Sequence, residues 1–112
     1  MKLLFQLLRK SLTKQKIIMV GTGYANFQWC EQRINDGSIE VIAFIDDEPW
    51  NHKTKLLNAP LKYPSELVAL CRKHKVDKVV VFEGGKIELT AEQVGKLEQL
   101  GVVVERVCEL MG

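Results

Sequence analysis

Four apolar runs rich in β-branched residues recur along this 112-residue chain, and segments with helical periodicity separate them. The apolar runs, which we interpret as strands, cover 16–21, 39–45, 77–82 and 102–107. The helical patterns cover 24–36, 64–74 and 91–100. A helix between two strands of one sheet carries the chain back across that sheet, so this alternation predicts mostly parallel strands. The near-continuous apolar character of the first two runs favours a sheet covered on both faces.

The segment 56–61 is ambiguous, and it decides the strand count. It is either a short edge strand or an extended loop, because Pro60 lacks the N–H that a central strand needs. Counting it as a strand, we predict an α/β fold of three layers with a mostly parallel five-stranded sheet in the order 3-2-1-4-5. That order places a crevice at the carboxyl ends of the strands 16–21 and 77–82, which is where open α/β sheets bind ligands.

The charge distribution separates a basic N-terminal arm from the rest of the chain. The formal net charge is +2, yet residues 1–16 hold five basic residues and no acid, so the remainder is mildly acidic. We predict a short amphipathic helix over 1–14 followed by one domain over 15–112. For this helix we favour packing on the domain or pairing with a second copy, giving a homo-oligomer, over contact with a membrane surface. The small net charge gives no reason to expect a nucleic-acid partner.

The first predicted strand ends in a glycine motif. Gly21-Thr22-Gly23 follows the apolar run and is followed in turn by Tyr24-Ala25-Asn26 at the start of a helical pattern. Two glycines at this spacing permit a tight turn and a close approach of the backbone, so that free N–H groups of the helix meet a diphosphate. Asn26 stands where the dinucleotide-binding fingerprint has its third glycine. We therefore take Gly21, Thr22, Gly23, Tyr24, Ala25 and Asn26 as candidate binding residues, with a tight turn that has lost its ligand as the alternative.

Acidic residues end the second predicted strand. Asp46 and Asp47 stand where such a unit places the carboxylate that accepts hydrogen bonds from a ribose. The alternative is turn chemistry at a strand end. Trp50, in the loop that follows, is a candidate for stacking on a base, although a tryptophan in a loop more often packs at the edge of a core. After the third strand, Lys86 is interpreted mainly as part of a solvated glycine turn, and secondarily as a partner of a diphosphate.

The sequence contains no readable catalytic set. It has no Gly-x-Ser-x-Gly, no His-Glu-x-x-His and no Walker lysine. Its three cysteines are widely spaced and form no Cys-x-x-Cys, so we expect reduced thiols and no metal. The apolar start is interrupted by Gln6 and closed by Arg9-Lys10, which is not typical of an export signal. We expect a cytoplasmic protein.

Residues 16–83 resemble the N-terminal Rossmann-like domain, sometimes called CoA-binding-like, of bacterial polysaccharide-biosynthesis proteins. These proteins are the nucleoside-diphosphate-sugar epimerase/dehydratases and the initiating sugar transferases, and the same pattern opens the nucleotide-sugar acetyltransferases. The pieces that carry the resemblance are Ile17-Ile18-Met19-Val20-Gly21-Thr22-Gly23, Val41-Ile42-Ala43-Phe44-Ile45-Asp46-Asp47-Glu48-Pro49, Asn58-Ala59-Pro60-Leu61, Pro64-Ser65-Glu66-Leu67 and Lys75-Val76-Asp77-Lys78-Val79-Val80-Val81.

The resemblance implies NAD or a nucleotide-sugar at residues 21–26, with Asp46 or Asp47 on the ribose. Two departures stand out: Asn26 replaces the usual glycine, and Glu83-Gly84-Gly85 replaces small uncharged residues. The sequence thus predicts a stand-alone nucleotide-binding module with an accessory or regulatory role, in polysaccharide biosynthesis if the resemblance extends that far. The alternative is an interaction or oligomerisation module of the same fold that no longer binds a nucleotide.

Overall fold

The computed structural model describes residues 14–48 and 55–108. The predicted helix over 1–14, apart from Lys14, and the candidate stacking residue Trp50 lie outside these residues. Both therefore remain sequence predictions. Among the described residues, no helix is long and apolar enough to cross a lipid bilayer.

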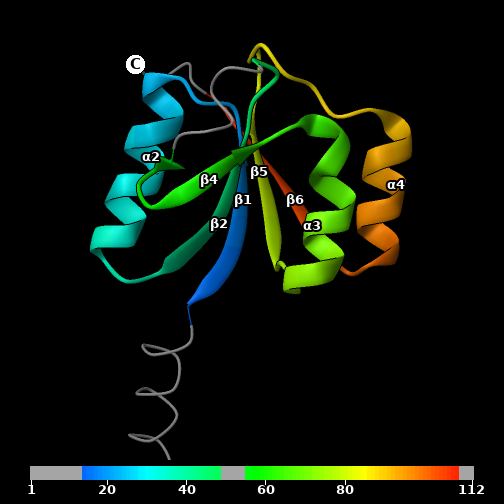
Figure 1. The fold of residues 1–112 in the computed structure, drawn as a ribbon, viewed down its shortest axis with the longest axis horizontal. Coiled ribbons are helices and arrows are strands. Elements are labelled where there is room, and N and C mark those ends of the chain that lie inside the picture. Colours follow the sequence, from blue (N-terminus) through cyan, green and yellow to red (C-terminus); the bar gives the residue numbers. More distant parts are fainter. Residues whose placement is uncertain (1–13, 49–54, 109–112) are drawn as a thin grey trace, which may run out of the picture.

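Strands and helices alternate as the sequence predicts (Figure 1). The strands are β1 (Gln15–Val20), β2 (Ile39–Ile45), β3 (Lys55–Leu56), β4 (Ala59–Lys62), β5 (Lys78–Phe82) and β6 (Val103–Val107). The helices are α2 (Tyr24–Asn35), the 3₁₀ turn η2 (Pro64–Glu66), α3 (Leu67–His74) and α4 (Ala91–Gln99). The predicted capping box opens α4: Gln93 N–H donates to Thr90 Oγ1 at 3.1 Å, and Thr90 N–H donates to Gln93 Oε1 at 3.0 Å.

The described part of the chain forms a six-stranded sheet in the order β3-β4-β2-β1-β5-β6. Every pair is parallel except β3 with β4. The predicted order of five strands is confirmed. The structure adds one strand, β3, which pairs with β4, so the ambiguous segment forms a small hairpin at the edge of the sheet. Pro60 pairs with Lys55 of β3, whereas β2 begins to pair only at Leu61. The missing N–H of proline therefore interrupts no bond to the central sheet.

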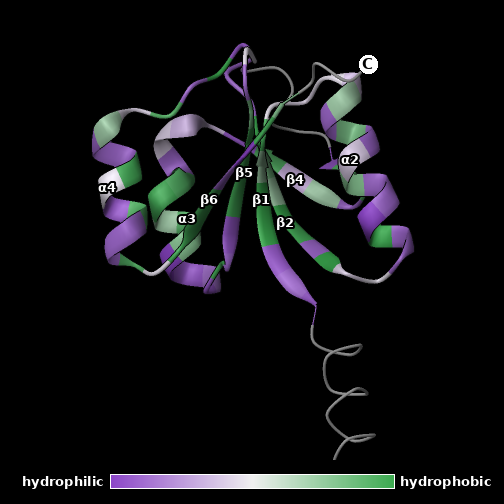
Figure 2. Ribbon diagram, turned by 180° about the vertical axis from the view of Figure 1, so that it is seen from behind, coloured by the Kyte–Doolittle hydropathy of each residue, from purple (hydrophilic) through white to green (hydrophobic). Residues whose placement is uncertain are grey.

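Helices cover both faces of the sheet and enclose two cores (Figures 1 and 2). Helix α2 lies on one face, and α3 and α4 lie on the other. Side chains alternate along β1, so that Ile17 and Met19 join the core beneath α2, while Ile18 and Val20 join the core beneath α3 and α4. All four are buried. The carboxyl end of β1 is thus fixed by packing on both faces and by a parallel strand on each side.

Candidate functional site

The junction between β1 and α2 is a tight three-residue loop. Gly21 has φ +109°, a conformation that L side chains rarely adopt, and its N–H donates to the Ile45 carbonyl at 2.9 Å. Gly23 caps the helix with φ −70° and ψ 171°, an extended conformation open to any residue. Backbone geometry therefore requires glycine at position 21 but not at position 23, where the absence of a side chain leaves the helix N-terminus open.

Asn26 fastens this loop from within the first turn of α2. Its side chain is only 8% exposed. Asn26 Oδ1 accepts the Gly23 N–H at 3.0 Å, and Asn26 Nδ2 donates to the Val20 carbonyl at 3.3 Å. The carboxamide thus occupies the space beside the loop, where a Cβ on Gly21 would lie 3.1 Å from Asn26 Oδ1. Two amides of the bend, those of Gly21 and Gly23, are thus satisfied inside the protein, while the N–H groups of the first turn of α2 have no partner within the helix.

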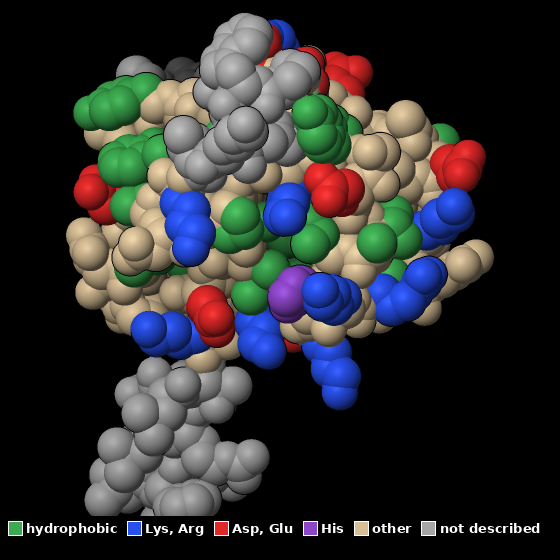
Figure 3. Space-filling model, in the orientation of Figure 1, with side chains coloured by type: hydrophobic (Ala, Val, Ile, Leu, Met, Phe, Trp, Pro, Cys, Tyr) green, Lys and Arg blue, Asp and Glu red, His purple; other side chains and the backbone are tan. Residues whose placement is uncertain are grey.

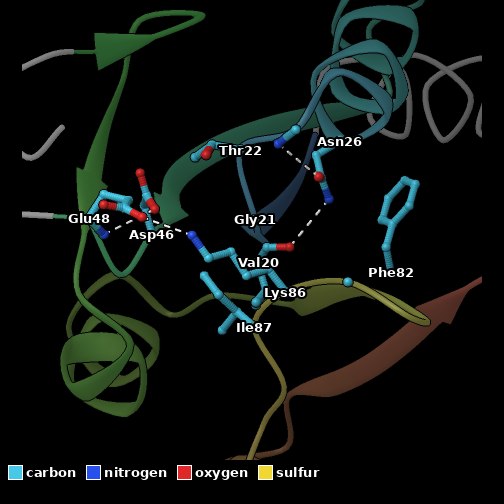
Figure 4. Close-up of a pocket in the computed structure, with 11 residues that line it drawn as sticks. Val20, Gly21, Thr22, Asn26, Asp46, Glu48, Phe82, Lys86 and Ile87 are labelled. Carbon is cyan, nitrogen blue, oxygen red and sulfur yellow. Dashed lines mark hydrogen bonds and ion pairs between the residues drawn. The ribbon is translucent and has the colours of Figure 1, made fainter.

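The acidic end of β2 lies beside this loop. Asp46 is 4% exposed, and its N–H donates to the Lys62 carbonyl at 2.9 Å. Asp46 Oδ1 in turn accepts the Glu48 N–H at 3.2 Å, which is the local turn that an aspartate at a strand end favours. The turn brings the Glu48 side chain to the same side as Asp46 (Figure 4).

Lys86 approaches these acids from the loop that follows β5. Lys86 Nζ lies 2.8 Å from Glu48 Oε1 and 3.9 Å from Asp47 Oδ1. The hydrogen bond to Glu48 and the negative charges of Asp47, Glu48 and Asp46 raise the pKa of Lys86 above its ordinary value. This acidic surrounding favours the charged form of Lys86.

A cavity of about 300 Å³ lies between these elements, at the carboxyl ends of β1, β2 and β5 (Figure 4). Its lining residues are Val20, Gly21, Thr22, Gly23, Asn26, Asp46, Glu48, Phe82, Gly85, Lys86 and Ile87. It therefore occupies the crevice that the strand order predicts. Its volume is at the lower end of the range for small-molecule sites.

The predicted binding residues divide into those in the cavity lining and those outside it. Gly21, Thr22, Gly23, Asn26 and Asp46 line the cavity. The lining does not include Tyr24, which is 75% exposed and accepts a hydrogen bond at its hydroxyl from Gln28 Nε2 at 2.9 Å. Nor does it include Ala25, which packs against the core beneath α2, or the exposed Asp47.

Sequence reasoning underrates the far wall of the cavity. Phe82, Lys86 and Ile87 line it from the end of β5 and the loop beyond, and Glu48 lines it from the other side. The sequence contains one clue to these residues: the predicted strand order already places the residues after Phe82 at the crevice beside β1. The sequence interpretation favours a solvated turn for Lys86. Its side chain is indeed 70% exposed, and it also belongs to the cavity lining.

The basic residues and the metal-binding potential of the described chain narrow the kinds of ligand that the site could hold. Among the described residues that line the cavity, Lys86 is the one cation. Other Lys and Arg side chains gather on the lower half of the face in Figure 3, toward the amino-terminal ends of the strands. Arg72, Lys73 and Lys75 are exposed at the carboxyl end of α3, outside the cavity lining. Within 14–48 and 55–108, no three His, Cys, Asp or Glu side chains come together as a metal site.

Comparisons with known proteins find similar folds. No protein-family model matches the sequence, and no curated protein matches it. The structure of UDP-D-quinovosamine 4-dehydrogenase from Vibrio fischeri is similar with a TM-score of 0.66 and 27% identity, covering 82% of this chain and 76% of that one. RSP, a Rex-family repressor, is similar with a TM-score of 0.68 and 12% identity.

The repressor comparison covers 96% of this chain, which spans 60% of the repressor chain. RSP is also known in complexes with NADH and with NAD⁺ and operator DNA. At such low identity the likeness shows the fold alone. The fold is Rossmann-like, as predicted. The sequence resemblance points to proteins that act on sugar nucleotides, and the similar dehydrogenase is named for such a substrate.

Proposed function

We propose that this chain is a nucleotide-binding module that holds NAD or a UDP-sugar type of nucleotide in the cavity at the end of β1. The observation that carries the proposal is the composition of the cavity lining, in which a glycine loop at a helix N-terminus, a buried aspartate and a lysine converge. The similar dehydrogenase is named for a UDP-sugar and the similar repressor binds NADH, and both ligands support the same class here.

Each part of the lining has a task suited to its chemistry. The free amides at the start of α2 and the positive end of its dipole receive the phosphates, as helix N-termini commonly do. Asp46, at the end of β2, accepts hydrogen bonds from ribose hydroxyls. Two neighbouring carboxylates disfavour a phosphate on the ribose, so we expect NAD to bind more tightly than NADP.

We propose an accessory or regulatory role for the module, without turnover of its own. The sequence carries no recognisable catalytic constellation. Of the acid–base groups in the described cavity lining, Glu48 pairs with Lys86, and Asp46 accepts the Glu48 N–H. The similarity to a UDP-sugar dehydrogenase favours a place in sugar-nucleotide metabolism, such as polysaccharide biosynthesis.

Calorimetric titration of the purified protein with NAD, NADP, ADP and UDP-glucose tests the proposal. Saturable binding that Gly23→Val weakens at least about tenfold supports it, because a side chain at position 23 blocks the approach to the amides. Gly95→Val is the matched control: that glycine is exposed on α4, has no positive φ, and a Cβ there would meet no atom within 4 Å. An absence of heat and of thermal shift across the nucleotides contradicts the proposal and favours the interaction module without a ligand.

A further inference from the structure

An ion pair joins the two walls of the candidate nucleotide cavity. Lys86 Nζ, from the loop after β5, lies 2.8 Å from Glu48 Oε1, from the loop after β2. Both residues line the cavity, and Figure 4 shows the lysine side chain extended toward the acids. The contact therefore crosses the space between the proposed ribose and phosphate subsites.

The pair is exchangeable. The Lys86 side chain is 70% exposed and that of Glu48 is 30% exposed, so water already competes for both groups. Exposed ion pairs contribute little to stability. A phosphate carries more negative charge than one carboxylate and offers more acceptor oxygens, so it competes well for an ammonium group.

The loop that carries Lys86 contains two glycines just before it. Gly84 has φ +78°, and a Cβ there would meet no atom within 4 Å. Gly85, in contrast, lies against Phe82, whose carbonyl accepts the Gly85 N–H at 3.1 Å, so the backbone is held in place just before Lys86. The long side chain of Lys86 is 70% exposed, so it can turn its ammonium group from Glu48 toward a phosphate at the glycine loop with no rearrangement of the backbone.

We propose that Lys86 is the phosphate-recognising cation of this site, held by Glu48 when the site is empty and transferred to the ligand's diphosphate on binding. This inference rests on the proposed function. It makes Glu48 an internal competitor of the ligand, and it leaves the Glu48 carboxylate available to ligand hydroxyls once the lysine has moved. The site should then discriminate nucleoside diphosphates from nucleosides mainly through Lys86.

Titrations of single and double variants with ADP and UDP, and with adenosine and uridine as uncharged probes, test the exchange. We expect Lys86→Gln to weaken binding of the diphosphates about tenfold and to leave nucleoside binding unchanged. Glu48→Gln should strengthen diphosphate binding about threefold, because the competing carboxylate is gone. In the double variant, Glu48→Gln should give no such gain.

Lys96→Gln is the matched control. Lys96 is exposed and pairs with Glu92 on α4, outside the cavity lining. This substitution removes the same charge and should leave diphosphate binding unchanged.

The outcomes separate this inference from the proposed function. Diphosphate binding that Lys86→Gln does not weaken, or that Glu48→Gln weakens, overturns the exchange while the binding module stands. A wild-type protein that binds neither ADP, UDP nor the larger nucleotides overturns both proposals.

Discussion

Two glycine loops face each other across the cavity, and they are built in opposite ways. The loop after β1 has three residues, Gly21 to Gly23, and the buried Asn26 fastens it with two hydrogen bonds. The loop after β5 runs from residue 83 to Thr90, with exposed glycines and an exposed lysine. The first wall is therefore preorganised. The second loop is anchored at Gly85 and through Ile87 and Leu89 on the core, so the part of that wall that can adjust is the exposed Lys86 side chain. Such a pairing suits a site in which one side positions a ligand and the other closes on its charge.

If the first loop is rigid, an added methyl group must cost more there than at another left-handed glycine. Gly21→Ala should lower the free energy of unfolding by about 3 kcal/mol, because φ +109° is strained for alanine and the new Cβ meets Asn26 Oδ1 at 3.1 Å. Gly37→Ala, at φ +80° with no atom nearby, should cost about 1 kcal/mol. Urea denaturation measures both, and equal losses would show that Asn26 does not constrain the loop.

An isosteric substitution of the Asn26 carboxamide tests its role in the first loop. In Asn26→Asp, one oxygen still accepts the Gly23 N–H, but the other faces the Val20 carbonyl without a proton to donate. We expect a loss of about 2 kcal/mol in the free energy of unfolding and about tenfold weaker ADP binding, since a negative charge now borders the phosphate subsite.

Gln32→Glu makes the same chemical change on an exposed part of α2 and should alter stability by less than about 0.5 kcal/mol. Chemical denaturation and calorimetry of the two variants provide the comparison. Unchanged ADP affinity in Asn26→Asp would remove the phosphates from the vicinity of this loop.

The far end of the second loop should matter for stability alone. Thr90→Ala removes the acceptor for the Gln93 N–H and should cost about 1 kcal/mol, the usual value for a helix N-cap. Because Thr90 does not line the cavity, ADP affinity should stay unchanged. Thr90→Ser keeps the hydroxyl and should recover most of the stability. A loss of binding in Thr90→Ala would show that the second loop is coupled to its helix.

The helices on the two sides of the sheet each bury a cysteine. We expect these thiols to lower the stability of the fold only at alkaline pH. Burial raises the pKa of Cys30 to about 12 and that of Cys71 to about 11, from an ordinary value of 9.0. Because the folded pKa values are the higher ones, the thiols cost nothing below pH 9. Above it they progressively destabilise the fold as the unfolded thiols ionise.

Thiol labelling of the native protein at about pH 8 checks this arrangement, because a thiol reacts as its thiolate and only when it is accessible. The exposed Cys108 should react fast, and Cys30 and Cys71 should react only as the protein opens. ADP should slow the labelling of both buried thiols, because a ligand of the folded state suppresses opening. Fast labelling of Cys30 would show that α2, and the rigid loop that begins it, opens easily.

The sequence was sufficient to predict the sheet and one wall of the cavity. Alternating apolar runs and helical patterns indicate the strand order, and a glycine motif at a strand end locates the proposed phosphate side. The β3–β4 hairpin escapes such reasoning because its turn is made by Leu57 and Asn58 at positive φ, where Asn-Gly is the usual signature. The contact between Lys86 and Glu48 joins residues 38 apart, and no local pattern reports such a pair.

The position of β1 in the middle of the sheet has a practical consequence. Its neighbours on both sides are themselves paired, so the edges of the sheet lie at least one strand away from the glycine loop. Leu57 packs against the core beneath α2, whereas Asn58 is exposed, so extra residues inserted after Asn58 would lengthen an outer hairpin and leave the cavity floor in place. That turn is thus a convenient attachment point for a fluorescent label with which to follow ligand uptake.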